Sequence, residues 1–215
     1  MKKRILCFGD SNTFGFDAKT QGRFGDDIRW TKRLGKALGD NYEIIEEGLG
    51  GRNAVCEDPL KEGMSAYTYL YPCLMTHKPL DLVIIMLGTN DSKERFSLTS
   101  FNIAMGIMRL TEKVKNSGAG PNLVDPPILI MAPPPIGEKY REKPAYLSMG
   151  RECDVKTKEM IPYLKAMVKD AGHDFLETGL SIAMGSEDYM HLDEVGHTKM
   201  AILVEEKIRD IFEKN

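Results

Sequence analysis

The sequence predicts an α/β protein, a three-layer α/β/α sandwich around a five-stranded parallel sheet of flavodoxin-like order 2-1-3-4-5. Two observations lead to this prediction. Short apolar segments alternate with longer segments in which apolar residues recur at helical spacing, and such alternation is typical of a parallel sheet covered by helices on both faces. Right-handed crossovers then favour a doubly wound sheet. Because 215 residues can bury one sizeable core, we expect a single domain over residues 1–215.

Five short segments rich in Ile, Leu and Val are predicted to be strands, because Gly, Pro or Asp bounds each of them. These segments are KRILCF (3–8), YEIIEEG (42–48), LDLVIIML (80–87), PILIMAP (127–133) and HDFLETG (173–179). The middle three are nearly continuous in apolar residues, which indicates strands covered on both faces.

Four amphipathic helices are predicted from apolar stripes with i, i+3, i+4, i+7 spacing. The stripes are Trp30, Leu34, Ala37 and Leu38; Ile103, Ala104, Ile107, Leu110, Thr111 and Val114; Met160, Ile161, Leu164, Met167, Val168 and Ala171; and Met200, Ala201, Val204, Ile208, Ile211 and Phe212. A further helix is expected over about 64–76. The Pro-rich stretch 132–144 is expected to be a loop.

Composition and charge exclude several classes of protein. The net charge is −3 without a long basic run, so we expect no nucleic-acid or membrane partner. The longest apolar stretch falls far short of the ~20 residues that span a bilayer, and the N-terminus lacks the apolar stretch of a signal peptide. The four cysteines form no CxxC pair. We therefore expect a cytoplasmic protein with reduced thiols.

Polar residues gather directly after the predicted strands. The segments are GDSNTFG (9–15), GLGGRN (48–53), GTNDSK (88–93) and SEDYMHLDEVGH (186–197). Because ligand sites of such sheets form outside the carboxyl ends of the strands, all four segments are expected on one rim. They are rich in the residue types that acyl-transfer chemistry requires.

Ser11 follows the first strand and has two interpretations. A serine at a strand-to-helix junction is often a helix N-cap. It can also be a nucleophile if a base takes its proton. His191 is the best-placed base, and Asp188, three residues earlier, could hold its imidazole and stabilise the imidazolium.

The other three histidines are weaker candidates for the base. His77 is expected in the connection between a helix and the third strand, as a surface or structural residue. His173 starts the fifth predicted strand, at the wrong end of the sheet. His197 opens the last helix, where capping or packing is the expected role, although Glu194 stands at the same i−3 spacing.

Stabilising the oxyanion requires further hydrogen-bond donors. The Ser11 N–H at a helix start, a bare N–H of Gly50-Gly51 and the side-chain amide of Asn90 are the candidates. Each also has an ordinary structural interpretation as a turn residue or flexible bend. Asp10 is expected to brace the loop by hydrogen bonds.

These segments resemble the successive sequence blocks of the SGNH hydrolases, also called the GDSL family. The matching segments are GDSN (9–12), a glycine after the second strand, GTND (88–91) and DYMH (188–191). The letters S, G, N and H of the name SGNH then correspond to Ser11, Gly51, Asn90 and His191. Asn12 stands where the GDSL name has leucine. The segments ILCFGDS, IIEEGLGGR and LDLVIIMLGTND are similar to the aryl esterase/acyltransferase branch.

The resemblance implies the SGNH hydrolase fold and a serine esterase or acyltransferase that needs no cofactor and no metal. Ser11, Asp188 and His191 would form the triad, and Ser11, Gly51 and Asn90 the oxyanion hole. That branch typically carries a tryptophan near Phe14 or Phe16, so the aromatic wall of the pocket is expected to differ here. We expect Phe14, Phe16 and Met190 to line a pocket for short acyl groups.

Substrates and partners follow from the same resemblance. Aryl esters, short acyl esters and acetylated sugars all stay open, with a deacetylase of acetylated sugars as the main alternative. A homo-oligomer is implied, as in the related branch. The sequence disfavours two other classes of protein. A metal-dependent phosphoesterase is disfavoured by the four dispersed histidines. A non-catalytic flavodoxin-like binding module is disfavoured because both GxxxxGK[ST] and GxGxxG are absent.

Overall fold

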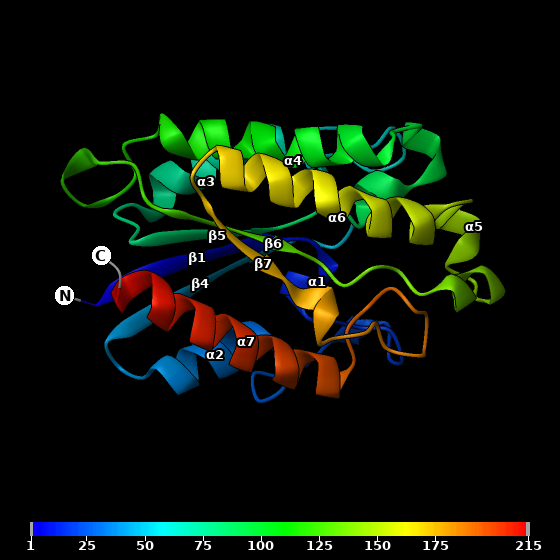
Figure 1. Ribbon diagram of the computed structural model, residues 1–215. Coiled ribbons are helices and arrows are strands. Elements are labelled where there is room, and N and C mark those ends of the chain that lie inside the picture. The colour runs from blue at the N-terminus through cyan, green and yellow to red at the C-terminus, as the bar shows by residue number, and fades with distance from the viewer. Residues whose placement is uncertain (1, 214–215) are drawn as a thin grey trace.

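The computed structural model describes residues 2–213, and within them a five-stranded parallel sheet lies between two layers of helices (Figure 1). The sheet order is β4-β1-β5-β6-β7. Numbered along the chain, these strands have the order 2-1-3-4-5, so the predicted topology is confirmed. The strands are β1 (Lys3–Gly9), β4 (Tyr42–Gly48), β5 (Leu82–Met86), β6 (Ile128–Ala132) and β7 (Asp174–Glu177).

Helices cover both faces of the sheet, as predicted. In Figure 1, one layer above the sheet contains α3 (Ala66–His77), α4 (Ser100–Lys115) and α6 (Cys153–Asp170), and the layer below it contains α2 (Trp30–Leu38) and α7 (Glu194–Glu213). Two elements are short: α1 (Ser11–Phe14) and α5 (Tyr146–Met149). A hairpin of β2 (Phe16–Asp17) and β3 (Gly22–Arg23) was not predicted, because each strand has only two residues.

The side chains of β1 show how the sheet separates two apolar cores. Leu6 and Phe8 pack against the layer of α3, α4 and α6. Ile5 and Cys7 point to the opposite face, into the core under α2 and α7. Successive residues of a strand alternate between faces, so a strand in the middle of the sheet must be apolar throughout. Each fully buried aliphatic side chain contributes about 1.5–3 kcal/mol relative to exposure.

One strand prediction is wrong. The segment 42–48 was expected to be covered on both faces, but β4 lies at the sheet edge and its residues are half-buried or exposed. The reason is visible in its sequence YEIIEEG, where three glutamates flank the two adjacent isoleucines and need solvent or ion pairs. In contrast, all five residues of both β5 and β6 are buried, as predicted.

A smaller difference concerns the bounds of helix α3. The helix expected over about 64–76 runs from Ala66 to His77, so His77 ends a helix rather than lying in the connection. It stops there because Lys78 precedes Pro79, and the residue before a proline avoids helical geometry. Within residues 2–213 no helix is long and apolar enough to cross a membrane.

Candidate active site

The predicted site residues come together at the carboxyl edge of the sheet. Ser11 follows β1, Gly51 follows β4, and Asn90 lies in a short 3-10 helix after β5. In the sheet, β1 lies between β4 and β5, so Gly51 and Asn90 flank Ser11 on either side. His191 comes from the long segment after β7 and reaches the same edge.

The local structure leaves the Ser11 hydroxyl unused by the helix. Asp10 is the N-cap of α1, since its Oδ1 accepts the Asn12 N–H at 2.9 Å. The helix ends after one turn at Gly15, whose φ of 83° is in the left-handed region that favours glycine. The capping interpretation of Ser11 therefore does not hold, and Asp10 braces the loop as expected. Ser11 Oγ accordingly remains available to another partner.

Ser11, His191 and Asp188 form a continuous hydrogen-bonded chain. His191 Nε2 lies 2.9 Å from Ser11 Oγ, and His191 Nδ1 lies 2.6 Å from Asp188 Oδ2. The other Asp188 oxygen accepts the backbone N–H groups of Met190 and His191, both at 3.0 Å. Tyr189 between them has a φ of 59°, the left-handed turn that folds the carboxylate back onto the ring. These contacts orient one imidazole nitrogen to the carboxylate and the other to the hydroxyl.

The electrostatics keep Asp188 charged. Burial works to raise the pKa of this carboxyl, but the hydrogen bonds from His191 and from the backbone outweigh burial, and the pKa lies below its ordinary value. A carboxylate held ionised beside the imidazole stabilises the imidazolium that forms when His191 takes a proton. The side chains of His191 and Asp188 are only 11% and 15% exposed, which limits screening by water.

Asn12 is a site residue that sequence reasoning missed. Its Oδ1 accepts the Leu192 N–H at 2.9 Å, and its Nδ2 donates to the Met190 carbonyl at 3.3 Å. These two backbone groups flank His191, so the buried amide clamps the histidine segment onto the serine segment. The available signal was the departure from the family pattern, an amide where the GDSL name has leucine.

Three groups are the candidate donors of an oxyanion hole: the Asn90 side chain and the N–H groups of Gly51 and Ser11. The Asn90 side chain is 6% exposed, and its Nδ2 has no hydrogen-bond partner among residues 2–213. Leaving a buried amide without a hydrogen bond costs about 1–3 kcal/mol of folding free energy. An oxygen atom of a bound substrate could supply the missing acceptor. Gly51 has a φ of 92°, which an L side chain rarely adopts. The Ser11 N–H belongs to the first turn of α1, where helical acceptors are lacking.

Two buried carboxylates lie behind this edge. Asp91 Oδ1 accepts the Ala54 N–H at 2.8 Å, which ties the loop of Asn90 to the loop of Gly51. Burial, with a contribution from nearby Asp10, raises the pKa of Asp91 to about 7. Burial likewise raises the pKa of Asp10 above its ordinary value. Both carboxylates hold the loops of the site by accepting backbone hydrogen bonds.

The three predicted pocket residues separate in the structure. Phe16 packs against the imidazole of His191, with the two ring centroids 4.6 Å apart. Phe14 instead lies under the guanidinium of Arg23, 4.4 Å from the ring centroid. Met190 is buried in a small cluster with Ile136, Tyr140, Met149 and Cys153. A pocket role for Phe14 and Met190 stays a prediction.

Two of the three remaining histidines, His197 and His77, have structural partners. His197 is fully buried and its Nδ1 accepts the Trp30 N–H at 3.3 Å, in agreement with the expected packing role. The Nε2 of His77 lies 2.8 Å from Glu47 Oε1. His173 precedes β7, at the opposite end of the strand from the site. In the described chain, His191 is the histidine that faces Ser11.

A parallel α/β sheet with a hydrogen-bonded serine, histidine and aspartate at its carboxyl edge is the arrangement of a serine hydrolase. The chain belongs to the GDSL-like lipase/acylhydrolase family, whose model matches residues 7–199. It is a carboxylic ester hydrolase of that family, and the resemblance seen in the sequence is confirmed.

Solved structures and a curated relative agree with this assignment. The inhibitor-bound aryl esterase of M. smegmatis is 36% identical, covers 97% of this chain and 99% of its own, and superimposes with a TM-score of 0.91. Est24, a carbohydrate acetylesterase from Sinorhizobium meliloti, is 34% identical over 98% of this chain and 100% of its own, with a TM-score of 0.91. A probable rhamnogalacturonan acetylesterase of Bacillus subtilis is 24% identical over 228 residues, 98% of this chain and 94% of the relative.

Proposed function

We propose that the protein is a serine esterase that cleaves short-chain acyl or aryl esters through an acyl-enzyme, with Ser11, His191 and Asp188 as its catalytic residues. The observation that supports this most directly is the hydrogen-bonded chain from Asp188 through His191 to Ser11, with contacts of 2.6 and 2.9 Å. Hydrogen-bond distances of this size allow proton transfer in the transition state.

In the first half-reaction, Ser11 Oγ attacks the ester carbonyl carbon while His191 Nε2 takes the hydroxyl proton. The carbonyl oxygen becomes an oxyanion that accepts hydrogen bonds from the Asn90 amide and the N–H groups of Ser11 and Gly51. The C–O bond to the leaving alcohol then breaks, and His191 returns the proton to the alkoxide. The acyl group stays on Ser11.

In the second half-reaction, water or another alcohol attacks the acyl carbon, and His191 again takes and returns one proton. The products are the acid or a new ester and the free serine. Asp188 remains a carboxylate throughout and stabilises the imidazolium in both steps. No residue in this scheme requires a metal, so we expect EDTA to leave ester turnover unchanged.

Short acyl groups are the preferred substrates in this proposal. The Phe16 ring lies directly against His191, and a bulky aromatic side chain beside the base restricts the depth available to a long chain. Each additional methylene that did fit would contribute at most ~0.8 kcal/mol. Acetate and butyrate esters should therefore turn over well, and palmitate esters poorly.

A deacetylase of acetylated sugars is the second candidate, and a cavity beside His191 favours it. This cavity has a volume of about 210 Å³ and is lined by His191, Asp17, Lys19 and Glu187 among others. Carboxylates and an ammonium group are suitable partners for the hydroxyls of a sugar. The similarity to carbohydrate acetylesterases supports the same reading.

The experiment that tests the proposed function is Ser11→Ala assayed on p-nitrophenyl acetate. Removal of one triad member commonly costs several orders of magnitude, so turnover should be abolished while the melting temperature is retained. Asn90→Ala should lower kcat by ~10² to 10³. A Ser11→Ala protein that keeps more than about a tenth of the wild-type kcat would show that the nucleophile is another group.

A substrate panel separates the two candidate functions. It compares p-nitrophenyl esters of increasing acyl length with acetylated xylose and acetylated xylan. A kcat/KM that is higher for the acetylated sugars assigns the deacetylase function, and one that rises steadily to C16 contradicts the short-acyl pocket. The homo-oligomeric state and the cytoplasmic location stay predictions, and gel filtration of the purified chain checks the former.

A further inference from the structure

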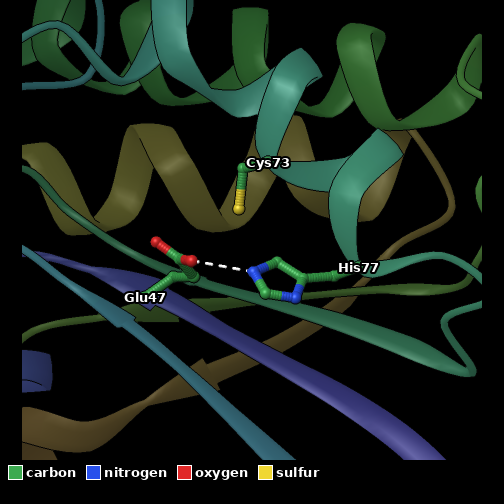
Figure 2. Close-up of side chains that lie close together, drawn as sticks. All are labelled: Glu47, Cys73 and His77. Carbon is green, nitrogen blue, oxygen red and sulfur yellow. Dashed lines mark hydrogen bonds and ion pairs between the residues drawn. The ribbon is translucent and has the colours of Figure 1, made fainter.

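Three metal-ligating side chains converge at a place that the proposed esterase mechanism does not use. They are Glu47 near the end of β4 and Cys73 and His77 of α3. Figure 2 shows the Cys73 sulfur pointing from the helix toward the paired side chains of Glu47 and His77. One ligand atom of each residue lies within 4.8 Å of the other two.

Helix geometry and strand position explain why the three side chains meet. Cys73 and His77 are four residues apart and therefore share one face of α3. That face covers the sheet, where Leu70 and Leu74 of the same helix are buried in the core. Glu47 belongs to the edge strand β4, over which the end of α3 lies. The sequence contains no recognisable metal motif, because Glu47 precedes the other two residues by more than 25 positions.

The three side chains have hydrogen bonds and burial that bear on metal binding. His77 Nε2 lies 2.8 Å from Glu47 Oε1, and Tyr69 Oη donates to the other Glu47 oxygen at 3.2 Å. Burial, together with the Glu47 carboxylate, raises the pKa of Cys73 to about 12, so the thiol carries its proton. The side chains of His77 and Glu47 are 25% and 19% exposed, so both can move slightly.

We propose that Glu47, Cys73 and His77 form a binding site for one divalent transition-metal ion of the Zn²⁺ class. An imidazole nitrogen, a thiolate and a carboxylate oxygen are the ligand types that Zn²⁺ takes in proteins. Two ligands of a tetrahedral zinc site lie about 3.4 Å apart, given bond lengths of about 2.0–2.3 Å. Opening the Glu47–His77 contact by roughly half an ångström would admit the ion. Binding forms an S–metal bond and releases the thiol proton to solvent.

The surroundings leave Glu47 open to a surface cavity and a fourth ligand position unused. A surface cavity of about 500 Å³ borders Glu47 and is lined also by Arg52, Thr68 and Tyr69. Three protein ligands leave one tetrahedral position for water. The positive charge of Arg52 acts on Cys73 and works against metal binding, but its guanidinium is held by the backbone carbonyls of Glu47 and Gly9 and by the Phe8 ring.

The experiment uses Co²⁺ as the probe on the full-length, untagged chain after treatment with EDTA. We expect one equivalent of Co²⁺ to produce a thiolate-to-cobalt charge-transfer band in the near ultraviolet, and one equivalent of Zn²⁺ to abolish it. Cys73→Ser should lose the band, and His77→Gln should weaken Co²⁺ binding at least about tenfold. Cys56→Ser is the matched control, because Cys56 is a partly exposed thiol outside the cluster, and it should keep the band.

The outcomes distinguish specific Co²⁺ binding at this cluster from binding elsewhere on the protein. If the wild-type chain gives no charge-transfer band, or if Cys73→Ser keeps it, the proposal is overturned. A band that Cys56→Ser removes also overturns it, since Co²⁺ would then bind elsewhere. Ester turnover and melting temperature show which variants fold. Should Cys73→Ser not fold, Glu47→Gln and His77→Gln decide, because both change partly exposed side chains: unchanged Co²⁺ affinity in both would refute the site.

Discussion

Two histidines six residues apart, His191 and His197, have contrasting environments. His191 lies at the edge of the sheet between a carboxylate and a hydroxyl. His197 lies under α2, where its Nδ1 accepts the Trp30 N–H and the Phe24 ring packs edge-on against it at 5.2 Å. The His191 imidazole contacts the two groups that the proposed mechanism requires, whereas the His197 imidazole is buried in the core.

The comparison teaches that a nearby acid does not make a histidine a base. Asp188 and Glu194 both stand three residues before a histidine. Only Asp188 contacts the ring, because the left-handed turn at Tyr189 reverses the chain there. Glu194 begins the regular helix α7, and its carbonyl accepts the Thr198 hydroxyl. Burial lowers the pKa of His197 to about 4, so this ring is neutral at physiological pH.

The largest expected effect is on kcat, and it tests directly whether His191 and His197 have different roles. His191→Ala should lower kcat on p-nitrophenyl acetate by at least about 10³, because Ser11 loses its base. His197→Ala should keep kcat within about threefold but lower the melting temperature, since it removes a buried ring and the acceptor of the Trp30 N–H. A stable but inactive His197→Ala beside an active His191→Ala would show that the triad is misassigned.

The next effect tests the two acids. Asp188→Asn should lower kcat by ~10² to 10⁴, because an amide favours the wrong imidazole tautomer and cannot stabilise the imidazolium. Glu194→Gln, at the same spacing from His197, is the matched control and should change kcat less than twofold. Steady-state kinetics on both variants make the measurement. Equal losses of kcat in the two variants would contradict the assignment of Asp188 as the carboxylate that assists the catalytic histidine.

A smaller effect tests how His191 is held. Asn12→Leu restores the residue of the GDSL name and removes both hydrogen bonds to the backbone beside His191. We expect kcat to fall roughly ten- to hundredfold with KM little changed, because misplacing a catalytic group by about 1 Å costs rates of this size. The low-field proton resonance of His191 Nδ1–H provides an independent readout and should broaden or shift. An unchanged kcat and resonance would show that the clamp is dispensable.

The smallest effect concerns stability and pH. In the unfolded chain His197 has its ordinary pKa of 6.5, and in the folded chain its pKa is about 4. Between these values the unfolded state binds the extra proton, so the free energy of unfolding should fall as pH decreases from about 6.5 to about 4, by on the order of 3 kcal/mol. Urea unfolding of wild type and of His197→Gln, compared across this range, isolates the contribution, because other titrating groups cancel. If the difference in the free energy of unfolding between the two proteins does not vary with pH, the proposed contribution of His197 is wrong.

The sequence by itself determined the architecture and most of the candidate site. Alternating strand and helix patterns specify a parallel sheet, and the carboxyl ends of parallel strands meet at one edge whatever the details of packing. The polar segments after β1, β4, β5 and β7 therefore had to converge. The sequence alone therefore predicts Ser11, Asn90 and Asp188 as residues of the site.

The tertiary structure alone decided which polar groups actually touch. The Ser11–His191 and Asn12–Leu192 hydrogen bonds each join residues 180 positions apart. The Trp30–His197 contact spans 167 positions, and the Glu47–His77 pair spans 30. Local patterns report only on neighbours within a turn or a strand, so they indicate which face a side chain occupies but not its partner. Partner choice depends on how the layers pack, and that packing turned one histidine toward a serine and buried the other.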